Sequence, residues 1–264
     1  MGQRVNRRMA FSAVAGRKKG VARGACQDAV FGKSLNGVSC IALSDGAGSR
    51  RLSGTGARRT VQIVVNLVLE NFDQIFDQVS QGDINAPKTQ IVRSIKEELS
   101  TDHFARRGDL EEYACTLIFA AAKENRLLLG HLGDGMAFSI ENGNGEVASW
   151  PENGEFANET FFVTANDAVE RLRLSTEVLE APRSILLASD GAAVSLLKRA
   201  DSTVAPAVAK LCEWTTSRAR KEMNAVLKAN LEGMFRDKTT DDCSIAIMAD
   251  PAAYISLDAA EISQ

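Results

Sequence analysis

Three apolar runs in this chain end in an aspartate followed by glycine, and this repeated ending constrains the fold more than any other feature. The runs are VSCIALSDG, LLLGHLGDG and ILLASDG, and their aspartates are Asp45, Asp134 and Asp190. A single Asp-Gly pair is most often a turn. Three such pairs after apolar runs indicate buried strands that present carboxylates at their ends, where oxygen ligands can be held in fixed positions.

The wider pattern predicts an α+β fold in which antiparallel sheets are covered by helices. We expect strands at 9–15, 28–33, 38–44, 115–122, 126–132, 136–140, 160–164, 174–178, 184–189 and 243–249. The strands between 115 and 140 are expected to follow one another as one antiparallel run, and 141–160 to form a loop or small excursion.

Helices are expected where apolar residues recur at helical spacing. One covers 57–72, with Ser53 as its N-cap, and a second presents one apolar face over 91–99. Two further helical stretches are expected to fill 192–231. Helices that occur in pairs, apart from runs of strands, favour layers of helix and sheet over an alternating parallel sheet.

Composition narrows the classes of partner. The chain has 31 basic and 34 acidic residues and a formal net charge of −3, so nucleic acid is not an expected partner. No stretch has the length of a membrane span or of a signal-peptide core, and five scattered cysteines without a Cys-x-x-Cys pair are typical of a reducing compartment. We therefore expect a cytoplasmic protein without membrane association. With no internal repeat or linker, a single domain over 1–264, with its core at about 9–250, is predicted.

Acidic residues at the predicted strand ends form the candidate site. They are Asp28, Asp45, Asp134, Asp190, Asp241 and Asp242. If the strand ends converge, such a cluster cannot stay ionised without cations, and all-oxygen ligands suit Mg²⁺ or Mn²⁺. Zinc does not fit, because His103 and His131 are far apart and have no cysteine at ligand spacing. His131 lies inside an apolar strand and is interpreted as a hydrogen-bonded core or rim residue.

Two such ions a few ångströms apart would bridge a water, lower its pKa and hold it in line with a phosphoryl group. A nearby cation could then bind the phosphate oxygens. Arg23, in a Gly-rich loop five residues before Asp28, is the candidate for this phosphate clamp. A solvated loop cation is an equally good interpretation of Arg23 from its local sequence.

Six segments of the chain resemble the signature segments of the metal-dependent 2C-type (PPM) Ser/Thr protein phosphatases, in the same order and with similar spacing. They are RGACQDAV, ALSDGAGS, CTLIFAAA, LGHLGDGMAF, ILLASDG and TDDCSIAI. PENGEFANETFFVT is similar to the compact bacterial branch of that family. The resemblance covers roughly residues 9–250 and implies a four-layer α-β-β-α sandwich of two antiparallel sheets, with two Mn²⁺ or Mg²⁺ ions, and a possible third, in the cleft between them.

By motif position, Asp45 resembles the carboxylate that bridges the two metals, and the carbonyl of Gly46 resembles a further ligand. Asp190 and Asp241 are similar to the other carboxylates of the second metal. Here Asp241 aligns with the family's invariant acid and Asp242 with its usual Asn, and an error of one residue would exchange these two roles.

Three further residues take roles from the resemblance. Asp28 resembles the acid that holds a metal mainly through water, Asp134 the acid that helps bind the third metal, and Arg23 the arginine that contacts the phosphate. Cys26 and Gln27 depart from the usual acidic or amide residues before Asp28, which leaves the outer metal shell open. Gly135 stands in the place of a Ser. Ala47 stands where animal members have His, so a water is expected to protonate the leaving group.

The predicted function is therefore Mn²⁺- or Mg²⁺-dependent hydrolysis of phosphoserine or phosphothreonine on proteins by a metal-bridged hydroxide. The substrate is expected to be the target of a Ser/Thr kinase, or the kinase itself. Two alternatives keep the same fold. One is a weak or inactive phosphatase-fold protein that binds or regulates a partner, and the other is a phosphatase of small molecules.

Overall fold

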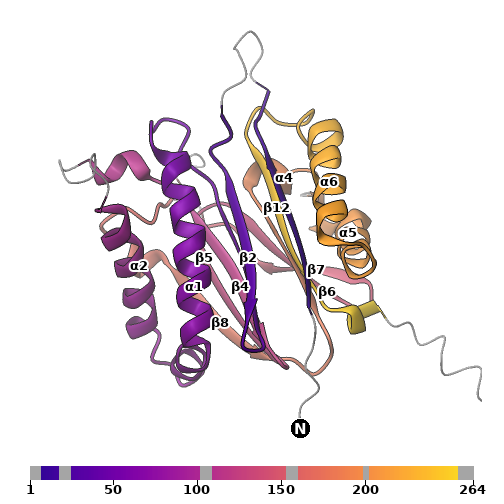
Figure 1. Cartoon of the computed structure of the whole chain (residues 1–264), viewed down its shortest axis with the longest axis horizontal. Helices are drawn as coiled ribbons and strands as arrows, with labels where there is room; N and C mark the ends of the chain where they lie inside the picture. Colours follow the sequence, from indigo (N-terminus) through magenta and orange to yellow (C-terminus); the bar gives the residue numbers. More distant parts are fainter. Residues whose placement is uncertain (1–6, 18–24, 102–108, 153–159, 199–201, 255–264) are drawn as a thin grey trace, which may run out of the picture.

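Strands that are apolar along their whole length need cover on both faces, and two packed sheets with outer helices supply it. In the computed structural model, which describes residues 7–17, 25–101, 109–152, 160–198 and 202–254, two five-stranded antiparallel sheets lie face to face (Figure 1). Strands β3 (Val38–Ser44), β9 (Ser184–Ala188) and β12 (Cys243–Ala249) are buried at every residue. Each is therefore an internal strand with a helix layer on one side and the other sheet on its opposite side.

The first sheet has the strand order β2-β3-β4-β5-β8 and is covered by a pair of helices. Its other strands are β2 (Ala29–Leu35), β4 (Leu117–Lys123), β5 (Arg126–Leu132) and β8 (Arg173–Val178). Helices α1 (Ser53–Ser80) and α2 (Asn85–Leu99) pack on its outer face through a cluster of buried aliphatic and aromatic side chains. Both helices lie together on the left of Figure 1.

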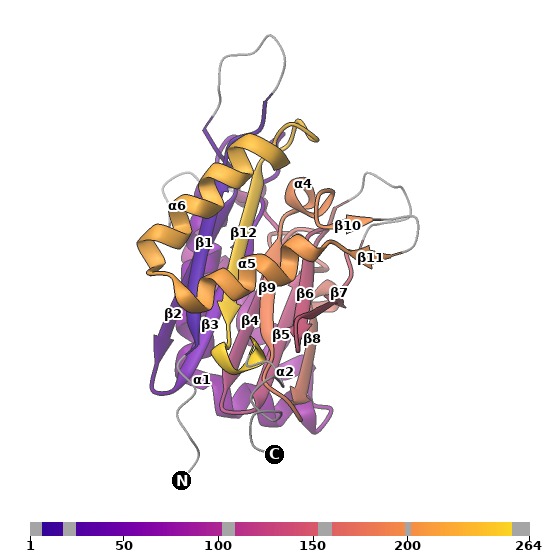
Figure 2. The same cartoon turned by 90° about the vertical axis from the view of Figure 1, so that its right-hand side faces the viewer.

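The second sheet has the order β1-β12-β9-β6-β7, and a second pair of helices crosses its outer face (Figure 2). Its other strands are β1 (Arg8–Val14), β6 (Met136–Glu141) and β7 (Asn144–Ser149), and its helices are α5 (Pro206–Ser217) and α6 (Arg220–Asn230). The smaller elements are η2 (Leu110–Tyr113), α3 (Ala168–Arg171), α4 (Asp190–Ala193), β10 (Leu197–Lys198), β11 (Thr203–Val204), the π-helix η3 (Leu231–Phe235) and η4 (Pro251–Tyr254).

A layer of buried apolar side chains fills the space between the two sheets. Its buried members include Ala120 and Ala122 from β4, Ala137 from β6 and Ala246 from β12, with larger side chains such as Leu187 between them. Packed sheets lie about 10 Å apart when their side chains interdigitate. Small and large side chains from both inner faces therefore form one continuous apolar layer between the sheets.

The predicted α-β-β-α sandwich is confirmed, and most of the predicted strands are present. One prediction about the order of strands was wrong, because β6 does not pair with β5 but joins the second sheet beside β9. The chain crosses from one sheet to the other at Gly133, whose φ of +118° lies in the region that favours glycine. Apolar periodicity is the same in both sheets, so it could not indicate this crossing.

Three local predictions were also wrong. Residues 160–164 form an isolated bridge and turns instead of a strand, and the loop or small excursion expected at 141–160 includes the short strand β7. The stretch 192–205 holds the end of α4 and the β10-β11 hairpin, so long helices begin only at Pro206. Ser53 is the first helical residue and not the N-cap, and its Oγ donates to the carbonyl of Arg50 at 2.9 Å. Within the described residues, no helix is both long and apolar enough to cross a membrane.

Helix α1 packs closely against η2, and a substitution at this contact tests the packing. A Cβ on Gly56 would lie 2.1 Å from the carbonyl oxygen of Tyr113, whereas a Cβ on Gly233 would meet no atom within 4 Å. We expect Gly56→Ala to lower the free energy of unfolding by about 2 kcal/mol, because the backbone of η2 must move. Gly233→Ala should leave stability unchanged or raise it slightly. Thermal and urea unfolding of both variants checks this, and equal stabilities would contradict the described contact.

Candidate functional site

Five of the predicted acids meet at one end of the sandwich, where strands of both sheets begin or end. Asp28 and Asp45 come from the first sheet, next to β2 and β3, and Asp190 and Asp241 come from the second sheet, next to β9 and β12. Asp134 lies in the connection that joins the sheets. The pairs Ala29↔Ser44, Ile245↔Ala188 and Met136↔Ala188 place these strand ends side by side.

A cavity of about 930 Å³ opens at this end of the molecule. Its lining includes Asp45, Gly46, Asp134, Asp190 and Asp241. Asp28 is buried beside Asp45. A cleft of this size can enclose a small group such as a phosphorylated side chain.

Burial, together with neighbouring negative charge, raises the pKa of three of these carboxylates. The pKa of Asp45 lies well above its usual range because the group is buried and because the charges of Asp28, Asp190 and Asp134 are near. Burial raises the pKa of Asp28, and the neighbouring charge of Asp242 adds to this. Burial, followed by the charge of Asp134, raises the pKa of Asp190. Without a cation, this cluster therefore binds protons at pH values where aspartates are ordinarily ionised.

The backbone around Asp45 is held by the neighbouring strand. The amide of Asp45 donates to Oγ1 of Thr116 at 2.9 Å, and the amide of Thr116 donates to the carbonyl of Asp45 at 2.9 Å. The amide of Ala47 donates to the carbonyl of Ala114 at 3.0 Å. At Gly46 a Cβ would lie 2.8 Å from the carbonyl oxygen of Gln27. Glycine is therefore required here, and the peptide that follows Asp45 has a fixed orientation.

Asp242 has a different environment from Asp241. Its two carboxylate oxygens accept hydrogen bonds from the backbone amides of Gly16 at 2.8 Å and Gln27 at 2.6 Å. Asp242 thus joins the end of β1 to the start of β2. Asp241 is the acid of this pair whose charge acts on Asp190. Both acids line the cavity, and the register in which Asp241 is the metal ligand stays a prediction.

Gln27 fastens the loop that follows Asp45. Its Nε2 donates to the carbonyl of Arg50 at 3.1 Å and to Oγ of Ser53 at 2.7 Å, so it joins the start of β2 to the first residue of α1. The sequence showed Gln27 only as a departure from the family pattern. Its partners lie more than twenty residues away along the chain, so no local pattern could indicate this function.

Asp134 is oriented by the segment that follows β7. Oγ1 of Thr160 donates to Oδ2 of Asp134 at 2.6 Å, and the amide of Glu152 donates to the carbonyl of Gly133 at 3.0 Å. Thr160 and Phe162 also line the cavity. The sequence places Thr160 in a loop or short strand and in the segment PENGEFANETFFVT, but its contact with Asp134 joins residues 26 positions apart, so no local pattern predicts it.

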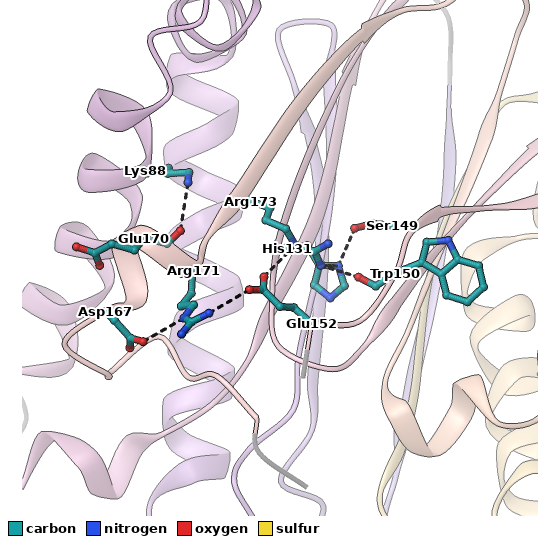
Figure 3. A network of polar contacts seen from close by, with 9 residues as sticks. All are labelled: Lys88, His131, Ser149, Trp150, Glu152, Asp167, Glu170, Arg171 and Arg173. Atoms are coloured by element: carbon teal, nitrogen blue, oxygen red, sulfur yellow. Dashed lines mark hydrogen bonds and ion pairs between the residues drawn. The ribbon is translucent and has the colours of Figure 1, made fainter. Parts of the chain in front are cut away.

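A polar network beside this segment fixes Glu152 and contains His131 (Figure 3). Glu152 forms ion pairs with Arg173 at 3.3 Å and Arg171 at 3.4 Å, and the guanidinium of Arg171 lies 4.0 Å from the ring centre of Phe161. Nη2 of Arg173 donates to Nδ1 of His131 at 2.9 Å. Since arginine only donates, Nδ1 is the acceptor and the proton of the neutral imidazole is on Nε2.

His131 is a structural residue, as predicted. Its side chain is buried and does not line the cavity, and its Nδ1 also lies 2.8 Å from Oγ of Ser149. Burial and the charge of Arg173 lower the pKa of His131 to about 3. The ring therefore stays neutral near pH 7. His103 and the predicted phosphate clamp Arg23 lie outside the described residues.

The carboxylate oxygens of these acids are the type of ligand that hard divalent cations prefer. Both carboxylate oxygens of Asp28 are buried without a hydrogen bond of good geometry, although Ser244 and Ser189 lie near. Such an orphaned carboxylate facing other acids is stabilised by a cation. Within the described residues, however, no three His, Cys, Asp or Glu side chains already enclose a single ion. A bound ion would therefore take part of its shell from water or carbonyl oxygens.

Buried carboxylates at strand ends define the class of site that binds divalent cations, and comparison with known proteins identifies the family. The profile of the protein phosphatase 2C family matches residues 15–232. The chain therefore belongs to the protein phosphatase 2C family, a family of protein serine/threonine phosphatases.

Individual relatives agree with this family. Serine/threonine-protein phosphatase 3 of Escherichia coli (strain K12) is 30% identical over 135 residues, 51% of this chain and 51% of that protein, so the match spans about half the length of the curated relative. The fold resembles the catalytic domain of the phosphatase PstP in complex with two manganese ions, with a TM-score of 0.59, 16% identity and coverage of 92% of this chain and 97% of that chain. Phosphatase Stp1 of Staphylococcus aureus gives a TM-score of 0.60 at 15% identity, over 94% of this chain and 95% of that chain.

Substitution of the adjacent acids tests the register. Asp241→Asn should weaken Mn²⁺ binding at least about tenfold, because it removes a charge that faces Asp190. Asp242→Asn keeps a carbonyl oxygen that can accept one of the two backbone hydrogen bonds, so its Mn²⁺ affinity should change less than about threefold. Calorimetric titration with Mn²⁺ measures both. The reverse order of effects would assign the ligand role to Asp242.

The buried His131 gives a pH prediction for stability. Its pKa is about 3 when folded and about 6.5 when unfolded, so the unfolded chain binds the proton more tightly and stability falls as the pH falls below 6.5. Between pH 7 and pH 5 this loss is about 2 kcal/mol. In His131→Asn, whose amide oxygen can replace Nδ1 as acceptor, the loss should be smaller by that amount. Urea unfolding in EDTA at both pH values measures this loss. An equal fall in the free energy of unfolding in the wild type and in His131→Asn would contradict the prediction.

Proposed function

We propose that this protein hydrolyses phosphoserine and phosphothreonine on proteins with the help of two Mn²⁺ or Mg²⁺ ions. The observation that carries this proposal is the convergence of acids from both sheets on one cavity in a chain of the protein phosphatase 2C family. The family is metal-dependent, and a relative of the same fold was crystallised with two manganese ions. A third ion near Asp134 stays part of the proposal.

Each acid has a proposed task. When bound, the ions would supply Lewis acidity that lowers the pKa of an attacking water and balances the charge of the phosphoryl group. Asp45 faces acids of both sheets, which supports a bridging role, and the fixed peptide at Gly46 supports its carbonyl as a further ligand. Asp190 and Asp241 would supply the carboxylate ligands that come from the second sheet. Asp28, buried beside Asp45, would act mainly through water.

The leaving alkoxide would receive its proton from water. Ala47 lines the cavity where animal members of the family have His, and no imidazole is among the described residues that line it. Arg23 is proposed as the cation that binds the phosphate. The substrates would be products of a Ser/Thr kinase, or the kinase itself. A cytoplasmic location, which the free cysteines favour, belongs to the same proposal.

A phosphatase-fold protein without turnover is the alternative, and the lack of a preformed three-ligand group among the described residues is the observation that favours it. The two functions differ in what Mn²⁺ does. The test measures Mn²⁺ binding and phosphate release from a phosphothreonine peptide, a phosphoserine peptide and p-nitrophenyl phosphate. Mn²⁺ binding without phosphate release from any of the three would favour the protein without turnover. Release from p-nitrophenyl phosphate and a small phosphorylated metabolite, but not from peptides, would favour a small-molecule phosphatase.

Asp45→Asn tests the proposed bridging role. We expect phosphate release from a phosphothreonine peptide to fall by more than about 100-fold, because both ions would lose a shared ligand. Mn²⁺ should raise the Tm of the wild type but raise that of Asp45→Asn much less, because only a bound ion stabilises the folded state. Without metal the variant should be no less stable than the wild type, since it lacks a buried charge.

Asp83→Asn is the matched control. Asp83 is exposed in the turn between α1 and α2, so this variant should keep both the activity and the Mn²⁺-induced rise in Tm. Full activity of Asp45→Asn with Mn²⁺ would show that the site is assigned wrongly.

A further inference from the structure

Arg236 enters the cavity from the end of α6 through an unusual turn. The π-helix η3 follows α6, and the amide of Arg236 donates to the carbonyl of Leu231, five residues earlier, at 3.0 Å. This wider turn buries Phe235 in the core of the second helix layer and places Arg236 among the residues that line the cavity. Single π turns inside helices occur frequently at functional sites.

Arg236 is a buried cation without an acidic partner. Its exposed fraction is 8%, its Nε is buried without a hydrogen bond, and its Nη2 donates to the carbonyl of Glu232 at 3.3 Å. Among the described residues, no carboxylate forms an ion pair with it. The adjacent Asp237 pairs with Arg17 at 2.7 Å instead. Buried arginines are normally paired, because a buried charge without a partner is costly.

A second buried arginine, Arg7, differs from Arg236 because it has an acidic partner. Arg7 is 6% exposed, pairs with the buried carboxylate of Asp250 at 3.5 Å and donates to the carbonyl of Glu124 at 2.6 Å. Arg7 lines no part of the cavity, whereas Arg236 does. The difference indicates that the missing anion of Arg236 arrives with a ligand.

We propose that Arg236 binds an oxyanion of the phosphorylated substrate, as a cation distinct from Arg23. This inference rests on the proposed phosphatase function. A guanidinium presents donors in a planar fork that matches two oxygens of a phosphoryl group or of a carboxylate. The anion is either the phosphoryl group itself or an acidic side chain next to the phosphorylated residue. Arg236 is thus a substrate-binding residue on the wall that β12 and the preceding turn form.

Steady-state kinetics of Arg236→Gln and Arg236→Lys test the proposal. The substrates are p-nitrophenyl phosphate, a neutral phosphothreonine peptide and the same peptide with acidic residues beside the phosphothreonine. We expect Arg236→Gln to raise KM about tenfold, the effect of one lost charge-assisted hydrogen bond, with kcat changed less than about threefold. Arg236→Lys, which keeps the charge but not the fork, should fall between Gln and the wild type.

The three substrates distinguish the two possible anions. A rise in KM for all of them means that Arg236 contacts the phosphoryl group. A rise confined to the acidic peptide means that it contacts a neighbouring carboxylate. Arg218→Gln is the control for the loss of one positive charge, because Arg218 pairs with Glu222 on the surface and does not line the cavity. Its KM values should equal those of the wild type.

Binding of inorganic phosphate gives a second measurement that does not depend on turnover. Calorimetry of the Mn²⁺-loaded protein should show phosphate affinity reduced about tenfold in Arg236→Gln if the phosphoryl group is the anion. Unchanged KM values and unchanged phosphate affinity in both variants, or a lowered Tm as the sole effect, would overturn the role of Arg236. Hydrolysis by the wild type would still support the proposed function in that case. If the wild type has no turnover, the proposed function fails and phosphate calorimetry decides the role of Arg236.

Discussion

Repulsion between buried carboxylates is the constraint on which the rest of this structure depends. Asp28, Asp45 and Asp190 come from different strand ends, and burial together with neighbouring charge raises the pKa of each. A fold that brings such groups together loses stability unless hydrogen bonds hold the backbone firmly and a cation or proton neutralises the charge. Pairing between β3 and β4, the α1 helix packed on them and the glycines at close approaches supply that backbone support.

Several polar residues that line the cavity also hold distant parts of the chain together. Asp242, Gln27, Thr116 and Thr160 each bond to a backbone amide, a carbonyl or another side chain that lies far away in sequence. They connect the two sheets, the start of α1 and the segment after β7. Asp45, Asp190 and Asp241 line the cavity with oxygens available to a ligand. Adjacent residues of similar chemistry, such as Asp241 and Asp242, can therefore have different roles.

The sequence was sufficient to predict the layers and the acids, because both depend on short patterns. An apolar run that ends in Asp-Gly predicts a strand end with a carboxylate, and Asp45 and Asp190 lie as that pattern predicts. The residues that were missed depend on distant partners. Gln27 contacts Ser53, Thr160 contacts Asp134, and Arg236 owes its position to a π turn. The errors have the same cause: β6 leaves its sequence neighbour β5 for the other sheet, and Ser53 begins α1 because Gln27 and Arg50 occupy its hydroxyl.

Packing between the two sheets has a consequence for the distant acids. Asp45 belongs to one sheet and Asp190 to the other, so the distance between the sheets sets the distance between these two carboxylates. Ala120, Leu187 and Ala246 lie among the buried side chains that fill the space between the sheets. A change in the volume of these side chains would therefore change the spacing of the proposed ion ligands while every acidic residue stays the same.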